Sequence, residues 1–227
     1  MARPSQQIDQ ALLSSGRALF PAMGCAGLSL RRVAEHAGVN VGMFHYHFKT
    51  KENFLRTLLL QMYEEMFATL SGQVQQGGAA IERLRAALIA LACFARGHRH
   101  VLARVWMDAV AGEAVARDFF RDNAPRHLGL LFGLLEQAHA DGDLHELPPV
   151  QRFAFLMGSV LMPMIFVAGL LESGTLPLGL QPAFEAQVMS DAAIAQRVDL
   201  ALAALRGEPR AAPRPRRTAR RTREDLR

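Results

Sequence analysis

Residues 41–51 bring together side chains that can bind nucleic acid. His45, Tyr46 and His47 offer hydrogen-bonding groups for phosphates and base edges. Lys49 and Lys51 follow directly and carry the positive charge that phosphates attract. The simpler alternative is a helical hairpin that binds nothing, and the adjacent lysines make it the less favoured one. The segment therefore predicts a DNA contact.

Two short helices are predicted to position these side chains. Ser29 can cap a first helix that has one apolar face, and Gly38 follows it where a helix end favours positive φ. Asn40 can then cap a second helix. Phe44 and Phe48 lie one turn apart on this second helix and are predicted to point inward. Two helices joined by a tight glycine-containing turn are the arrangement of a helix-turn-helix DNA reader.

The segment from Ile8 to about Met66 resembles the TetR family of transcriptional regulators. The matching motifs are Ser29-Leu-Arg-Arg-Val-Ala34, Gly38-Val39-Asn40 and Gly42-Met-Phe-His-Tyr-His-Phe-Lys-Thr-Lys-Glu52. In that family the short third helix enters the major groove, and a long fourth helix leads to a helical ligand-binding and dimerisation domain. The sequence departs from the family at Met43, often a small hydroxyl residue, and at His45, often tyrosine. The recognised DNA sequence therefore does not follow from the resemblance.

The resemblance also implies which residues contact DNA. They are Arg31, Val41, Gly42, Met43, His45, Tyr46, His47 and Lys51. Arg31 begins the helix that crosses the DNA backbone, and Met43 is placed to touch a thymine methyl. Tyr46 and His47 are expected at phosphates or nearby bases. Lys51 lies in the first turn of the fourth helix, where its charge and the free backbone N–H groups can bind one phosphate together.

The net charge of +5 is unevenly distributed over the 227 residues. Residues 1–56 carry +4, residues 57–206 carry −4 and residues 207–227 carry +5. This distribution favours a double-stranded DNA partner at one end of the molecule. Cys25 and Cys93 are the only cysteines, and the first residues lack the apolar run of a signal peptide. We therefore predict a cytoplasmic protein without a disulfide framework.

The hydrophobic periodicity predicts an all-α fold. It consists of an N-terminal three-helix helix-turn-helix domain and a C-terminal helical-bundle effector and dimerisation domain. The predicted DNA-binding domain covers residues 6–66, with the reading motif at 29–48, and the ligand-binding and dimerisation domain covers 67–206. Residues 207–227 are predicted to be a disordered Arg-rich tail, which either is a solvated extension or adds non-specific DNA affinity.

The positions of glycine and proline residues predict where the helices end. A first helix is predicted from Gln6 to about Met23, and Pro21 is predicted to end or distort its last turn. Beyond the reading motif, helices are predicted over residues 51–75, 79–96, 99–111, 115–123, 125–140, 150–172 and 183–205, the first of them capped by Thr50.

Residues 153–171 contain no charge, and two interpretations follow. Nineteen uncharged residues are long enough to span a membrane. However, Gly158 and Pro163 interrupt the segment, and neither end carries Trp or Tyr. A helix that is apolar all round is also typical of a subunit interface. Because a two-fold DNA reader needs a dimer, we predict a homodimer core here and no membrane.

Large apolar residues in the middle of the chain predict a pocket for a small apolar effector, by family resemblance. The candidates are Phe94, Trp106, Met107, Phe120, Phe132, Met162 and Phe166. For any single one of them, ordinary core packing is the favoured interpretation. Asp108 and Glu113 could bring a carboxylate near such a pocket, but a solvated face is the favoured interpretation for both.

Catalytic and metal-binding chemistry is not expected. Residues 139–145 contain histidines and aspartates, but this composition is also ordinary for a helix end and turn. No nucleophile motif or phosphate-binding glycine loop stands out, so neither an enzyme activity nor a cofactor is predicted. The sequence predicts a homodimeric, ligand-responsive transcriptional repressor that binds a palindromic operator. A DNA-binding regulator without small-molecule response and a membrane-associated helical protein are the alternatives.

Overall fold

The computed structural model describes residues 4–175 and 177–206, so the predicted Arg-rich tail lies outside the described residues. Within these ranges the fold is all-α, as predicted, and an isolated bridge between Leu144 and Arg206 is the sole β-type pairing. The elements are α1 (Pro4–Gly27), α2 (Leu30–His36), α3 (Val41–Phe48), α4 (Lys51–Val74), α5 (Ala80–Gly97), α6 (Arg99–Val110), α7 (Ala114–Ala140), α8 (Pro149–Val160), η1 (Pro163–Val167), α9 (Ala168–Glu172), η2 (Leu178–Leu180), α10 (Gln181–Phe184), η3 (Glu185–Met189) and α11 (Asp191–Leu205).

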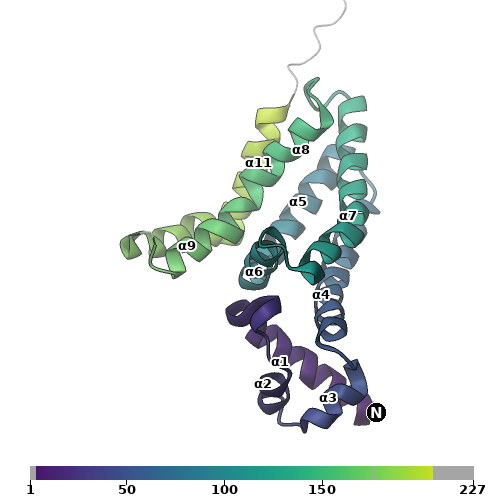
Figure 1. The fold of residues 1–227 in the computed structure, drawn as a ribbon. Helices are drawn as coiled ribbons and strands as arrows, with labels where there is room; N and C mark the ends of the chain where they lie inside the picture. Colours follow the sequence, from purple (N-terminus) through teal and green to yellow (C-terminus); the bar gives the residue numbers. More distant parts are fainter. Residues whose placement is uncertain (1–3, 176, 207–227) are drawn as a thin grey trace, which may run out of the picture.

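Two hydrophobic cores meet along α4. Leu58, Leu59 and Met62 pack with α1, α2, α3 and the facing parts of α6 and α7. From Tyr63 onward, α4 packs into the second core with α5, α7, α8 and α11. Figure 1 shows the two parts one below the other, with α4 running from the small N-terminal part into the larger bundle. A single rigid helix therefore joins the two cores.

The first helix breaks close to its predicted end near Met23, but not at the predicted residue. Pro21 lies inside α1 without ending it, and the helical geometry breaks three residues later at Gly24, which has φ 65° and ψ −173°. Positive φ costs glycine little, so the chain can turn there and still continue to Gly27. The distortion that the sequence assigned to the proline is therefore produced by the glycine.

α7 is one helix through Pro125, whereas two helices were predicted. Proline at position 125 has no N–H to donate to the Arg121 carbonyl, yet the helix continues through it. The Tyr63 hydroxyl donates to the Asn123 carbonyl at 2.7 Å, and the Asn123 amide donates to the Phe119 carbonyl at 2.8 Å. The first of these bonds joins the turn before Pro125 to α4, a contact that the sequence pattern of α7 does not contain.

The last two predicted helices are each interrupted. The run from Pro149 leaves α-helical geometry near Leu161 and continues as the π-helical segment η1, which starts at Pro163. The final helix is divided at Ser190, whose backbone is extended. The Ser190 hydroxyl caps α11 by accepting a hydrogen bond from the Ala193 N–H. The intervening segment, from α9 to η3, projects sideways from the bundle in Figure 1. We refer to residues 168–189 as the arm.

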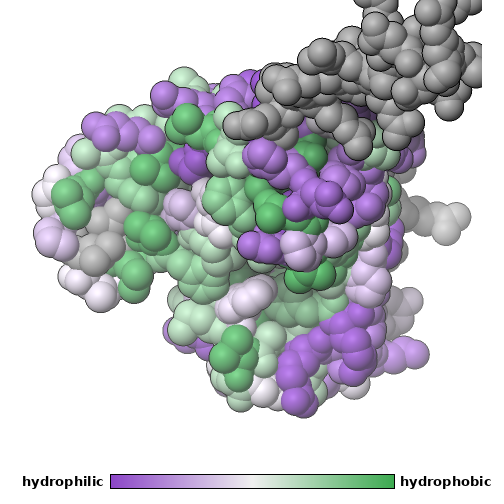
Figure 2. All heavy atoms as spheres, turned by 90° about the horizontal axis from the view of Figure 1, so that it is seen from above, coloured by the Kyte–Doolittle hydropathy of each residue, from purple (hydrophilic) through white to green (hydrophobic). Residues whose placement is uncertain are grey.

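The helical run from Pro149 to Leu170, which includes most of the uncharged segment, buries only one of its faces. Residues at four-residue spacing are almost fully buried: Arg152, Leu156, Val160, Met164 and Ala168. The other faces stay open, with Val150 69%, Phe155 42% and Leu170 44% exposed. Pro149–Leu170 is long and apolar enough to cross a membrane by length and composition alone, which for a single helix is weak support for a span. Figure 2 shows exposed hydrophobic side chains over the arm and the upper face.

Candidate nucleic-acid interface

The reading helix α3 is held by one cap and three aromatic rings. The Asn40 side chain accepts a hydrogen bond from the Gly42 N–H at 2.7 Å, as predicted, and Gly38 has φ 68°. Phe44 and Phe48 are buried, and the ring of Phe54 lies 4.9 Å and 5.0 Å from theirs. These contacts fix α3 against α4 and leave its opposite face uncovered.

The preceding helix α2 is placed as expected but capped differently. Ser29 occupies the N-cap position, yet its hydroxyl makes no capping hydrogen bond, so the predicted cap is wrong in its chemistry. Val33 and Ala34 are buried and hold α2 in the N-terminal core. The Arg31 side chain is 83% exposed and donates to Glu35 at 2.8 Å. An exposed i,i+4 pair of this kind is worth only about 0.3–0.5 kcal/mol, so a phosphate can compete for the guanidinium.

Most of the predicted DNA-contacting residues of α3 share its uncovered face. Tyr46 is 75% exposed and Val41 40%, and Gly42 and His45 are also exposed. Met43 is half-buried beside them. A Cβ added to Gly42 would lie 3.2 Å from the capping oxygen of Asn40, so a side chain there would crowd the cap. The glycine therefore leaves room for the cap and adds no side chain to the uncovered face of α3.

His47 does not lie on this face. Its side chain is 7% exposed, and its Nδ1 lies 2.5 Å from a carboxylate oxygen of Asp9 in α1. The predicted contact between His47 and DNA is therefore corrected: in this structure the imidazole faces α1. Helical spacing alone could not place it, because His47 borders both the buried and the exposed side of α3.

Lys51 lies at the start of α4, as predicted, but its ammonium group already has a partner. Nζ donates to the Ala26 carbonyl at 2.6 Å, near the end of α1. The Thr50 hydroxyl caps α4 by accepting from the Asn53 N–H at 3.1 Å. An ammonium group has three donors, so two remain for a phosphate at this helix start. Lys51 thus joins the end of α1 to the beginning of α4.

A buried polar junction between α1 and α6 was missed by the sequence reasoning. Asp108 is 5% exposed and accepts from the Cys25 N–H at 2.6 Å and from Arg104 Nε at 3.0 Å. A second guanidinium nitrogen of Arg104 donates to the Met23 carbonyl at 3.4 Å. The predicted solvated position of Asp108 is therefore wrong. The i,i+4 spacing of Arg104 and Asp108 was the available signal.

The kink at Gly24 makes this junction possible. A Cβ at Gly24 would lie 2.1 Å from Arg104 Nε, so only glycine lets the guanidinium approach the backbone. Burial, followed by the hydrogen bond and charge of Asp108, raises the pKa of the Cys25 thiol to about 12. We refer to Gly24, Cys25, Arg104 and Asp108 as the α1–α6 clasp.

Similarity to known proteins agrees with this geometry. Residues 12–58 match the model of the bacterial regulatory proteins of the tetR family. The matched segment contains α2, α3 and the start of α4. The HTH-type transcriptional repressor KstR2 of Mycolicibacterium smegmatis (strain ATCC 700084 / mc(2)155) is 22% identical over 143 residues, which cover 62% of this chain and 69% of KstR2.

Solved structures share the whole fold at low sequence identity. FadR of Bacillus subtilis, solved with stearoyl-CoA, superposes with a TM-score of 0.65 at 16% identity, covering 86% of this chain and 98% of FadR. HlyIIR, a hemolysin II transcriptional regulator, superposes with a TM-score of 0.61 at 18% identity, covering 90% of this chain and 99% of HlyIIR. The TetR-type reader and the C-terminal helical bundle therefore occur here in the arrangement of solved regulators.

The predicted effector-binding residues are divided among several contacts in the described part of the chain. Trp106, Phe120 and Phe166 gather edge-to-face, with ring centroids 5.6 Å and 6.1 Å from Trp106. We refer to these three as the Trp106 cluster. Phe132 instead stacks on Phe153 at 4.9 Å.

The remaining predicted residues lie apart from the Trp106 cluster or at its surface. Phe94 stacks on His98 at 4.1 Å, Met107 is 60% exposed and Met162 is half-buried. The seven residues predicted to bind the effector therefore lie in several different environments. Spacing along the chain could not distinguish these environments, because each residue is large and apolar in all of them.

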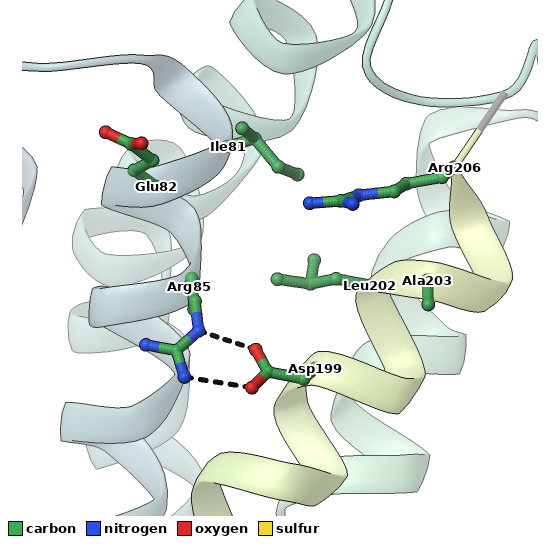
Figure 3. A pocket seen from close by; sticks show the side chains of 7 residues that line it. All are labelled: Ile81, Glu82, Arg85, Asp199, Leu202, Ala203 and Arg206. Atoms are coloured by element: carbon green, nitrogen blue, oxygen red, sulfur yellow. Dashed lines mark hydrogen bonds and ion pairs between the residues drawn. The ribbon is translucent and has the colours of Figure 1, made fainter. Parts of the chain in front are cut away.

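A pocket of about 300 Å³ lies elsewhere, between α5 and α11. It is lined by Ile81, Glu82, Arg85, Asp199, Leu202, Ala203 and Arg206, none of which was predicted. Figure 3 shows the bidentate ion pair of Arg85 and Asp199 at one end and the Arg206 guanidinium above Leu202 at the other. The pocket is an open groove beside a surface ion pair and is separate from the Trp106 cluster.

Proposed function

We propose that this chain is a TetR-family transcriptional repressor that binds a palindromic operator as a homodimer and is released by a small apolar effector. The observation that carries the DNA-binding role is the uncovered face of α3, because the three phenylalanines hold it rigidly and its N-terminal residues point outward. Readers of this kind insert the second helix of the motif into the major groove. The repressor named KstR2 supports the direction of regulation.

The apolar surface left open on the last helices supports the homodimer. Phe155 of α8 is 42% exposed and Leu200 of α11 is 65% exposed, although these two helices pack against each other. Exposed apolar surface of this kind marks an interaction site. A second copy that covers it places two reading helices on one face of the duplex, roughly 34 Å or more apart.

The Trp106 cluster supports the effector response. It lies where α6, α7 and η1 meet, and Trp106 is 46% exposed, so an apolar ligand can gain burial there. Acyl-CoA thioesters are the first class to test, since FadR was solved with stearoyl-CoA. Trp106 lies on α6 between Arg104 and Asp108, so a shift of α6 on effector binding is transmitted to α1 through the α1–α6 clasp.

The experiment has three parts. A duplex is first selected from a random pool with the full-length protein, and footprinting on it is expected to protect a symmetric site. Monomer-sized, asymmetric protection contradicts the dimeric repressor. Stearoyl-CoA is then titrated into the complex, with Trp106→Ala as the matched variant. The proposal is supported if stearoyl-CoA releases the wild-type protein from the duplex and releases the Trp106→Ala protein less effectively. If a panel of acyl-CoA thioesters and apolar small molecules leaves the complex intact, the chain regulates without this response.

A further inference from the structure

The reading helix has a polar contact with α1 that DNA binding does not explain. His47 lies in the last turn of α3, and its Nδ1 is 2.5 Å from Oδ1 of Asp9. The contact has an ion-pair distance without hydrogen-bond alignment, and Nε2 is buried without a hydrogen-bond partner in the described part of the chain. Burying an imidazole in this way is costly unless the carboxylate compensates for it.

Asp9 is the acidic group that faces this imidazole. Two cations of the neighbouring elements have other partners: Arg31 pairs with Glu35 in α2, and Lys51 of α4 donates to a backbone carbonyl. The ring of Tyr46 stands perpendicular to that of His47, with centroids 5.0 Å apart. His47 therefore lies between Asp9 on α1 and the most exposed aromatic residue of the reading helix.

A short helix needs more than one contact line to fix its rotation. α3 has eight residues, so tertiary contacts decide its orientation. Phe44 and Phe48 are four residues apart and lie along one line of the helix, which anchors α3 without fully fixing rotation about that line. The contact between His47 and Asp9 lies off this line and supplies the second constraint.

We propose that Asp9 and His47 form a positioning pair that sets the rotation of α3 and the direction of Tyr46 toward the groove. His47 acts through Asp9 and makes no DNA contact of its own. This inference rests on the proposed DNA-binding function and adds to it two specificity-determining residues, one of them on a helix outside the helix-turn-helix.

If Asp9 acts only through its charge, its loss should raise the affinity for DNA; if it positions α3, its loss should lower the affinity for the preferred sequence. Removing a negative charge from a DNA-binding domain strengthens binding to any duplex, because less phosphate repulsion remains. Loss of a positioning pair instead weakens binding to the preferred sequence only. Glu52, an exposed acid in the first turn of α4, offers a matched control for the purely electrostatic effect.

The experiment compares full-length Asp9→Asn, His47→Gln, the double variant and Glu52→Gln. Dissociation constants are measured on the duplex selected with the wild type and on a scrambled duplex of equal length, over a range of salt concentrations. We expect roughly tenfold weaker binding of the selected duplex by each single variant, and no further loss in the double variant. The scrambled duplex and the salt slope should change little. Asp9→Glu, which keeps the carboxylate, should recover part of the affinity.

Three results overturn the positioning pair. Asp9→Asn overturns it by binding the selected duplex as tightly as Glu52→Gln does, or more tightly. His47→Gln overturns it by lowering the salt slope by about one unit, because that identifies a direct phosphate contact. Independent losses that add in the double variant overturn it as well. A wild type that selects no sequence refutes the DNA-binding function itself, which is a different outcome from any of these.

Discussion

Replacing Asp108 by alanine should destabilise the protein by about 3 kcal/mol, at the lower end of the cost of breaking a buried ion pair. The carboxylate is 5% exposed and accepts from the Cys25 N–H and from Arg104. Its loss leaves the backbone N–H buried without this acceptor, which costs about 1–3 kcal/mol. Leaving the Arg104 guanidinium without its carboxylate partner costs less, because this side chain is 32% exposed and water can reach it.

The assay is urea unfolding followed by circular dichroism at equal protein concentrations, since a dimer makes stability concentration-dependent. A loss of about 3 kcal/mol corresponds to a drop in Tm of roughly 6–12 °C for a chain of this size. Asp118→Ala is the matched control, because Asp118 pairs with Arg56 and Arg121 at the surface. Because water screens this surface pair, its loss should destabilise the protein much less than the loss of Asp108.

DNA binding tests what the α1–α6 clasp does beyond stability. At a temperature where both proteins are folded, Asp108→Ala should bind the selected duplex but respond less to the effector, because α6 no longer holds the end of α1. Equal stability of Asp108→Ala and Asp118→Ala would refute the role of the buried carboxylate. Unchanged effector release by a folded Asp108→Ala protein would refute the transmission through α6.

Three further predictions follow from other contacts. Lys51→Ala should weaken binding to all duplexes and lower the salt slope by about one unit in filter-binding titrations, and an unchanged slope would exclude a phosphate contact. Cys25 keeps its proton up to a pKa of about 12 in the folded chain, whereas the unfolded thiol loses it near 9, so folding stability should fall as pH rises from about 9 to 12. In urea titrations this loss should be smaller in Cys25→Ala; identical pH profiles would contradict the assigned burial. Leu200→Asp should convert the dimer into a folded monomer in sedimentation velocity, while Val110→Asp, 77% exposed on α6, should stay dimeric. A dimeric Leu200→Asp protein would move the interface away from α11.

The local patterns of the N-terminal domain were sufficient to predict its main elements. Asn40 and Thr50 cap their helices, Gly38 adopts positive φ, and Phe44 and Phe48 point inward. These features depend on neighbours within a few residues, which is why sequence alone predicts them. The all-α class follows from the same short-range periodicity.

Contacts between distant segments decided the rest. Whether His47 faces DNA or Asp9, and whether Asp108 faces water or Cys25, depends on residues 38 and 83 positions away along the chain. α7 continues through Pro125 next to a hydrogen bond from α4, and the kink of α1 falls at Gly24, where Arg104 needs space. Burial and charge pairing are properties of packed helices, so periodicity within one helix cannot assign them. The sequence by itself therefore determined the all-α class and the helix-turn-helix of the N-terminal domain, while the tertiary structure decided where the later helices break and which polar side chains of α3 stay exposed.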